Sequence, residues 1–314
     1  MIKYSQYIGI IIGAIYGIII RIIGGIEILN DYYSIYSITF IWITPIIICL
    51  LPIFITSNRV YKSNVKQFFL PFISIIVFFL LALSTRLEDA LCLLILGIPF
   101  FIIAGVIGVV AAFFVKKWKI KKGIYSILIV PLILNPIENL YPNNTKIFSI
   151  ENSIIVNEDQ GTIWENILEV PEIKNEEYNP GFFNFIGVPR PIKSETYYKD
   201  GLIFRRGYFT DNLILVESIS NIVENKYVNF KIHIDQSILR NTPTDRHLLK
   251  SKYFSFQNIS YKLEPINKKT YRIILRCEYK IESKMNFYAN FWASKIINDF
   301  EKRLLDAIKL KLEK

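Results

Sequence analysis

Apolar stretches of nearly membrane-spanning length dominate the first 115 residues and constrain this chain more than any other feature. A helix needs roughly 20 apolar residues to cross the hydrocarbon core of a bilayer. Four stretches approach that length, and a fifth is shorter and contains two prolines. The pattern predicts an α-helical transmembrane bundle of four or five spans over residues 1–139. The five stretches are Ile8–Leu29, Ile35–Ile55, Phe68–Leu83, Leu91–Val115 and Ile124–Ile137.

Charge divides the chain near Asn135. The chain carries a net charge of +10, with 11 Lys and Arg against 4 Asp and Glu before this point and 26 against 23 after it. Short cytoplasmic loops accumulate Lys and Arg, so the basic loops 57–67 and 116–122 are predicted to be cytoplasmic, together with the N-terminus. This topology fits a multi-pass protein of the bacterial inner membrane. The basic excess then faces anionic lipid head groups, and we expect no nucleic-acid partner.

The fifth apolar stretch decides on which side of the membrane the second half of the chain lies. If Ile124–Ile137 spans, residues after 140 are periplasmic or extracytoplasmic; if it lies in the interface, they are cytoplasmic. Five lysines stand immediately before this uncharged run. They resemble a boundary from which a helix departs, and we expect the stretch to span.

A stripe of small residues and one charge share a face of the first span. Gly9, Gly13, Gly17 and Arg21 recur every four residues, which places them on one side of a helix. One interpretation is a close-packing seam whose arginine reaches Glu27, Asp31 or Asp89. The other is an intramembrane charge that lines a path or a lipid head-group site.

After residue 140 the hydrophobic pattern changes to the two-residue period of β-strands. A strand over Ser149–Val156 is followed by a short helix over Asp159–Val170, with Asp159 as its N-cap. A terminal helix is expected over Asn286–Leu312. The other predicted strands are Ser194–Tyr198, Leu202–Tyr208, Leu213–Ile222, Lys226–Asp235, Tyr253–Glu264 and Thr270–Ser283.

The last strand and the terminal helix each present one apolar face. In the strand, Leu275, Cys277 and Tyr279 alternate with charged residues, as in an antiparallel sheet with one buried side. In the helix, residues every four positions from Tyr288 to Leu312 are apolar, and they include Trp292 and Ile296. A long antiparallel sheet curved around a terminal amphipathic helix is the α+β helix-grip arrangement.

Residues 140–314 also resemble a known family, the START-like (SRPBCC) superfamily of polyketide cyclase and lipid-transfer-like proteins, and within it a membrane-anchored bacterial branch. The resemblance implies a cavity between sheet and terminal helix that holds an apolar or amphipathic ligand. Family members range from carriers to cyclases and hydrolase-like enzymes. The resemblance is carried by Ile163-Trp164, Val188-Pro189-Arg190-Pro191, Arg205 to Phe209, Leu215 to Ile219, His247, Tyr261-Lys262-Leu263 and Tyr288 to Leu305.

Two residues are candidates for catalysis in this half. Glu217 shares an inward face with Leu215, where its carboxylate could act as an acid or base or hold a ligand; alternatively it pairs with Arg205 or Arg276. His247 lies in a connector near the expected cavity mouth and could act as a gate or base, or cap backbone carbonyls. The predicted ligand-binding residues are Leu215, Glu217, Leu275, Cys277, Tyr279, Trp292 and Ile296.

The composition excludes several other chemistries. Three cysteines and two histidines are too few and too scattered for a metal centre, and no phosphate-binding glycine loop or nucleophile elbow is present. We therefore expect no metal and no cofactor. The leading prediction is a membrane protein whose START-like domain binds a lipid or isoprenoid-like molecule. The alternatives are a cyclase or hydrolase-type enzyme, and a transport or assembly function of the bundle with the soluble domain as sensor; the oligomeric state stays open.

Overall fold

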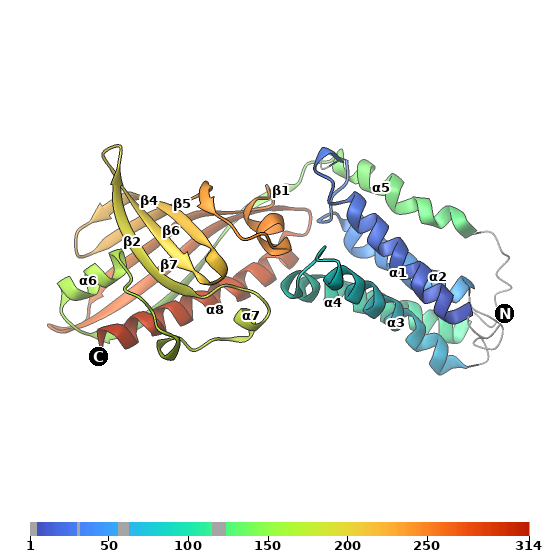
Figure 1. Cartoon of the computed structure of the whole chain (residues 1–314), viewed down its shortest axis with the longest axis horizontal. Helices are drawn as coiled ribbons and strands as arrows, with labels where there is room; N and C mark the ends of the chain where they lie inside the picture. The colour runs from blue at the N-terminus through green and yellow to red at the C-terminus, as the bar shows by residue number, and fades with distance from the viewer. Residues whose placement is uncertain (1–4, 30–31, 56–62, 115–123, 314) are drawn as a thin grey trace. The chain divides into compact units, whose positions relative to one another are not determined.

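The chain divides into two compact units, which we call the helical unit (residues 1–143) and the sheet unit (residues 144–314) (Figure 1). The computed structural model describes residues 5–29, 32–55, 63–114 and 124–313. Several residues used to predict the topology lie outside this described part. They are Asp31, Arg59, Lys62 and the lysines between 116 and 122.

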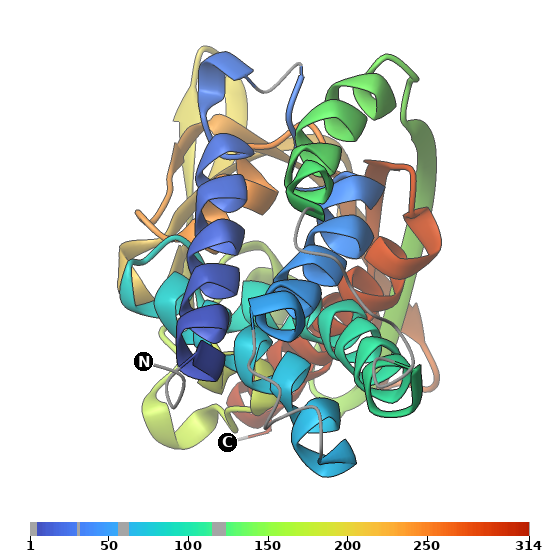
Figure 2. The ribbon, with the colours of Figure 1, turned by 90° about the vertical axis from the view of Figure 1, so that its right-hand side faces the viewer.

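Apolar helices form the helical unit, and Figure 2 shows α1 to α4 running side by side. Helix α3 starts after Ser63, whose hydroxyl accepts a hydrogen bond from the Lys66 amide at 3.4 Å. Short 3-10 turns cover Glu27–Leu29 (η2) and Ile124–Ile129 (η5), and a π-helical turn covers Thr39–Ile43 (η3). The α-helices are α1 (Ser5–Ile23), α2 (Thr44–Ile55), α3 (Asn64–Ser84), α4 (Ala90–Phe114) and α5 (Val130–Asn139).

The prediction of four or five spans is not confirmed. Within the described residues, two helices, Asn64–Ser84 and Ala90–Phe113, are long and apolar enough to cross a membrane, which is weak evidence for membrane association. Three further apolar helices, Tyr7–Ile23, Thr39–Ile55 and Ser126–Asn139, are shorter. The first two predicted stretches shorten because much of the described chain between α1 and η3 forms turns.

The glycine stripe of α1 lies against α2. A Cβ atom at Gly13 would stand 2.7 Å from the Ile48 carbonyl oxygen, and one at Gly9 would stand 2.7 Å from the Cα of Pro52. At Gly17 a Cβ would meet the Ile48 side chain at 2.6 Å. These separations leave no room for a side chain, so glycine is what allows the two helices to approach, as the close-packing interpretation requires.

Arg21 ends this stripe in a buried ion pair with Glu88. Its Nη2 also donates to the Leu87 carbonyl oxygen at 3.0 Å. The sequence suggested Glu27, Asp31 or Asp89 as the partner of Arg21, and Glu88 was not among them. It lies in the turn between α3 and α4, which only the packing of these helices brings near α1.

The sheet unit contains one seven-stranded antiparallel sheet in the order β1-β7-β6-β5-β4-β3-β2. All seven predicted strands are present. The largest difference is β1, which begins five residues earlier than predicted because it pairs with β7 along its whole length. The strands are β1 (Asn144–Asn157), β2 (Pro191–Lys199), β3 (Leu202–Phe209), β4 (Ile214–Val223), β5 (Tyr227–Ile238), β6 (Phe254–Pro265) and β7 (Thr270–Ser283).

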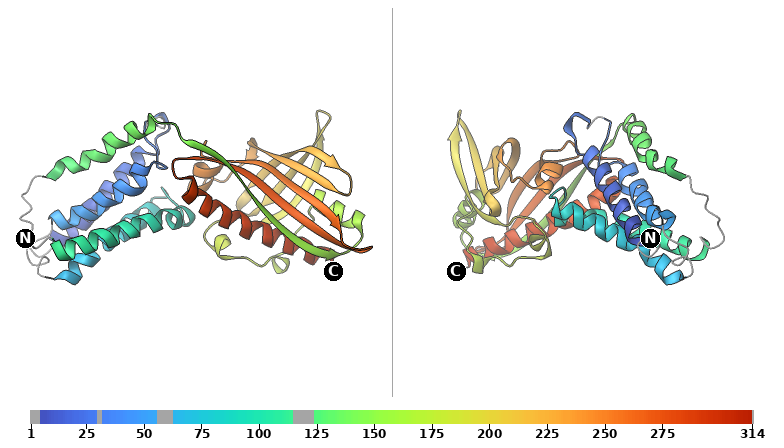
Figure 3. Two further views of the ribbon diagram at one scale, coloured as in Figure 1. Left: turned by 180° about the vertical axis from the view of Figure 1, so that it is seen from behind. Right: turned by 45° about the vertical axis from the view of Figure 1, so that its right-hand side comes forward.

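Helix α8 (Asn286–Leu312) runs along one face of this sheet, beneath β1 and β7 (Figure 3). Helix α6 (Gln160–Leu168) follows β1, and the Asp159 carboxylate caps it by accepting from the Gly161 amide at 2.9 Å. The remaining elements are short: α7 (Phe182–Phe185), η6 (Asn175–Glu177), η7 (Thr210–Asn212) and η8 (Asp245–Leu249). An antiparallel sheet with a long terminal helix fits the helix-grip prediction.

The buried face of α8 differs from the predicted stripe. Ile296 and Phe300 are only half-buried, whereas Ile297 and Glu301 are buried. A strict four-residue spacing advances about 40° around the helix at each step, because an α-helix has about 3.6 residues per turn. A stripe drawn through every fourth residue therefore drifts off the sheet-facing side.

Candidate ligand-binding site between the sheet and the last helix

Strand register brings the predicted ligand-binding residues to one face of the sheet. Glu217 lies opposite Ile232, and Ile219 opposite Phe230; through β5 and β6 this face continues to Leu275 and Cys277. Leu215 and Tyr279 belong to the same alternation in β4 and β7. Trp292 is buried on α8. The five strand residues therefore share the inward face, whereas Trp292 and Ile296 of α8 belong to neither buried apolar cluster of this unit, and Ile296 is only half-buried.

Buried apolar residues between the sheet and the helices form two separate clusters among the described residues. The larger cluster contains Phe230, Leu275 and the C-terminal half of α8, including Leu304 and Ile308. The smaller contains Cys277, Tyr279, Ile281 and Ile297. Ile259 is a half-buried neighbour of both clusters. Along α8, the smaller cluster ends at Ile297 and the larger begins at Leu304, and the two meet at Ile259.

Glu217 forms a buried ion pair with Arg205 from the neighbouring strand. Arg205 Nε donates to Glu217 Oε2 at 2.5 Å, and each residue is 5% exposed. The guanidinium also donates to the Ile167 carbonyl at 3.0 Å and stacks 3.5 Å above the Phe230 ring. Of the alternatives for Glu217, pairing with Arg205 is the one that the structure displays. The pair ties α6 to the inner face of the sheet.

Tyr279 and Cys277 are both buried in the interior of the sheet unit. The fully buried Tyr279 donates its hydroxyl hydrogen to Asn290 Oδ1 on α8 at 2.8 Å, and burial raises the pKa of its phenol to about 12. Burial also raises the pKa of the Cys277 thiol. A thiol with a raised pKa is a poor nucleophile at neutral pH. Neither side chain shows the features of an activated catalytic group.

Glu301 is the polar residue of this interior that the sequence analysis missed. Its side chain is on α8 between the two apolar clusters, and the residue is 2% exposed. Oε2 accepts from Asn152 Nδ2 of β1 at 2.7 Å, whereas Oε1 has no partner within the described chain. Desolvation by burial raises the pKa of this carboxyl to about 7, against the opposing effect of the Asn152 bond. The sequence does contain a signal for this position, because Glu301 lies four residues after Ile297 and four before Leu305, on one apolar side of the helix.

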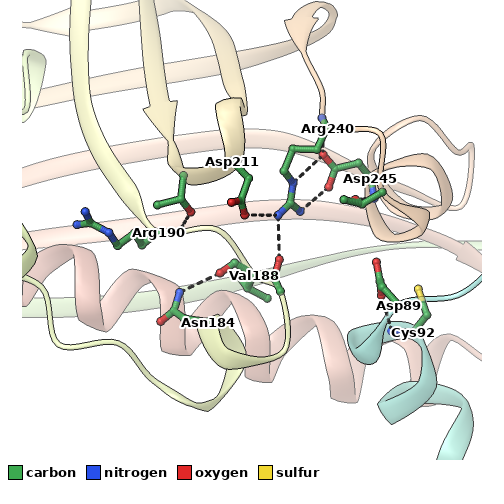
Figure 4. A network of polar contacts seen from close by, with 11 residues as sticks. Asp89, Cys92, Asn184, Val188, Arg190, Asp211, Arg240 and Asp245 are labelled. Atoms are coloured by element: carbon green, nitrogen blue, oxygen red, sulfur yellow. Dashed lines mark hydrogen bonds and ion pairs between the residues drawn. The ribbon is translucent and has the colours of Figure 1, made fainter. Parts of the chain in front are cut away.

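The connector that carries His247 is fixed by an arginine network (Figure 4). Arg240 Nη2 and Nε bond to the buried Asp245 at 2.6 and 3.1 Å, and its Nη1 donates to the Gly187 carbonyl at 2.9 Å. Asp211 stands 3.6 Å from the same guanidinium. Three loops thereby meet at one end of the sheet. His247 itself lies in η8, in the connector between β5 and β6.

His233 belongs to the opposite face of the sheet, where it pairs in register with Val216. Its Nε2 lies 2.8 Å from the Ser218 hydroxyl, and its ring is 6.1 Å from the Phe204 ring. The residue is half-buried.

No family model and no curated protein matches the chain. Solved structures do match about half of it. A START superfamily protein from Mycobacterium smegmatis is 11% identical, over 52% of this chain and 97% of that chain, with a TM-score of 0.36. The Zhui aromatase/cyclase from Streptomyces sp. R1128 is 9% identical, over 54% and 94%, with a TM-score of 0.34.

Norcoclaurine synthase from Thalictrum flavum is 15% identical, over 55% of this chain and 98% of that chain, with a TM-score of 0.34. Identities and scores this low transfer no ligand, activity or partner to this protein. The description of the fold rests on the strand order and on the position of α8.

Replacing one member of the Arg205–Glu217 pair should destabilise the sheet unit. Arg205→Leu and Glu217→Leu each leave a buried charge without its partner, and we expect each to cost about 3–5 kcal/mol. The loss of unfolding free energy in the double variant should be far smaller than the sum of the losses in the two single variants. Denaturant unfolding of the full chain, followed by tryptophan fluorescence, measures all four proteins. Strictly additive costs would contradict the pairing.

Glu301 should make stability depend on pH in a defined window. Its pKa is higher in the folded chain than the ordinary value of 4.5, so the folded state binds more protons between about pH 4.5 and 7. The stabilisation is complete below this window and is lost as pH rises through it, by roughly 3 kcal/mol.

The measurement is the difference between the pH–stability curves of wild type and Glu301→Gln, since the amide does not titrate. The comparison removes the contributions that other titrating groups make equally to both proteins. A flat difference curve from pH 4.5 to 7 would show that Glu301 is not desolvated.

Proposed function

We propose that the sheet unit is a START-like domain that binds an apolar or amphipathic small molecule between the sheet and α8. The observation that carries the proposal is a buried and incompletely bonded carboxyl, Glu301, on the stretch of α8 between residues of two apolar clusters. Protein interiors are ordinarily closely packed and hydrogen-bonded. A ligand with a long apolar surface would join the two clusters.

The contacts of the candidate groups favour binding over acid–base catalysis. Glu217 is engaged by Arg205, Tyr279 by Asn290, and the thiol pKa of Cys277 is raised. A general acid or base needs a proton-transferring group within reach of the substrate. These three groups instead support the interior surface, so we place the ligand-binding function ahead of the cyclase or hydrolase alternative.

We further propose that the chain is a multi-pass membrane protein with the sheet unit outside the cytoplasm. The C-terminal end of α5 is fastened to the segment between the first two apolar stretches. Asn135 exchanges hydrogen bonds with the Ser34 backbone at 3.1 and 3.2 Å, and Glu138 accepts from the Thr39 amide at 2.8 Å. The distribution of Lys and Arg assigns this segment to the outer side.

The fifth segment is long enough for this topology. With rises of about 2.0 and 1.5 Å per residue, η5 and α5 together cover roughly 27 Å, close to the ~30 Å hydrocarbon core. The segment would then run from the basic, cytoplasmic residues near 122 to the outer side. A lipid-soluble ligand is concentrated in the bilayer, so a tethered domain meets it at high effective concentration.

Native mass spectrometry of the full chain, purified from bacterial membranes in detergent, tests the binding function. We expect a stoichiometric apolar adduct on the wild type. Ala293→Trp should lose it, because Ala293 packs against the smaller cluster on the sheet-facing side of α8. Lys295→Trp is the matched control, with the same new side chain at an exposed position of the same helix. Absence of any adduct across lipid mixtures would contradict ligand binding.

The topology proposal predicts that the β6–β7 turn is accessible from outside the cell. Lys268→Cys places a thiol at an exposed position in this turn. A membrane-impermeant maleimide should label it on intact bacterial cells as fully as after lysis. The unsubstituted chain, in which Cys49 and Cys277 are buried and Cys92 is partly exposed, gives the background labelling. Labelling that requires lysis would assign the sheet unit to the cytoplasm and favour the four-span alternative.

A further inference from the structure

One oxygen of the Glu301 carboxyl lacks a hydrogen bond although the side chain is buried. Asn152 occupies Oε2, and the buried Oε1 has no donor among the residues that the structure describes. Two polar groups on the facing strands are already engaged. The Tyr279 hydroxyl donates to Asn290, and the Arg205 guanidinium serves Glu217 and the Ile167 carbonyl.

The surroundings of Glu301 restrict which groups could donate the missing hydrogen bond to Oε1. Ile297 lies one helical turn before it in the smaller apolar cluster, and Leu304 and Leu305 lie one turn after it in the larger cluster. On the sheet, Asn152 pairs in register with Leu275. A group that reaches Oε1 must therefore arrive through apolar surroundings, attached to an apolar body.

We propose that Glu301 Oε1 accepts a hydrogen bond from the polar end of the bound ligand, which is therefore an apolar molecule carrying a hydroxyl or an amine. This inference rests on the proposed ligand-binding function and deepens it. Above about pH 7, where Glu301 is ionised, its carboxylate is an acceptor only, so it bonds to donors such as O–H and N–H. A ligand whose polar end is itself a carboxylate or phosphate would bring two like charges together in a desolvated place.

The site thus selects for alcohols and amines and against acids. The apolar body of the ligand would lie along the two clusters, between the inward residues of β7 and the face of α8 that carries Ala293 and Ile297. Asn152 has a positioning role: its amide holds the carboxyl by Oε2 and leaves Oε1 to the ligand.

Three naphthalene probes that differ only in their polar group test this selectivity. They are 2-naphthalenemethanol, its methyl ether and 2-naphthoic acid, which supply a donor, an acceptor alone and an anion. Binding to the full chain in detergent is measured by probe fluorescence at pH 8, with empty micelles as the blank. Wild type should bind the alcohol about tenfold more tightly than the ether, and the acid least tightly.

Glu301→Leu removes the acceptor and keeps an apolar side chain of similar reach. The alcohol and the ether should then bind equally, with the affinity for the ether unchanged. Glu301→Gln supplies a second test should the leucine variant not fold, because its amide can donate. This variant should narrow the alcohol-to-ether ratio and improve binding of the acid, and thermal unfolding of each variant verifies folding.

The failures are distinguishable. If wild type binds the alcohol and the ether equally, or if the ratio stays the same in both variants, Glu301 does not contact the ligand although the domain binds one. If wild type binds none of the three probes, the ligand-binding function itself is overturned for apolar molecules of this size.

Discussion

The packing of α8 against the inner face of the antiparallel sheet is the contact on which the sheet unit depends. The sheet alone would expose the apolar alternation of β7, and α8 alone would expose one side of a 27-residue helix. Together they bury Leu275, Tyr279, Leu305 and Ile308. The burial of apolar side chains such as these is the dominant favourable term in folding. Every candidate for ligand binding lies on one of these two surfaces.

The buried carboxylates Glu217 and Glu301 differ in how completely they are bonded. The Arg205–Glu217 pair is fully engaged, with a carboxylate, a backbone carbonyl and an aromatic ring around one guanidinium. Glu301 is engaged at one oxygen only. A complete network makes a well-defined interior, whereas an incomplete one offers a bonding position to another molecule. This difference is the physical basis for locating the ligand's polar end at Glu301 rather than at Glu217.

Local sequence patterns were sufficient to predict most elements of the sheet unit. Strand β7 and helix α8 have the predicted bounds, because strict alternation and a long amphipathic repeat each determine an element by themselves. Glu301 was missed because a four-residue repeat drawn from Trp292 passes through Phe300. The partner of Arg21 was missed for a different reason. Glu88 is 67 residues away along the chain, and only helix packing brings the two together. In the helical unit, the first two apolar stretches are longer than the helices that they form, because turns interrupt them.

The most direct measurement of the central claim is an experimental structure of the full chain purified from its membrane without removal of bound lipid. We expect continuous ligand density between β7 and α8, with a polar end within hydrogen-bond distance of Glu301 Oε1. An interior in which the two apolar clusters close upon each other, with Oε1 bonded by a water or a protein donor, would contradict this expectation.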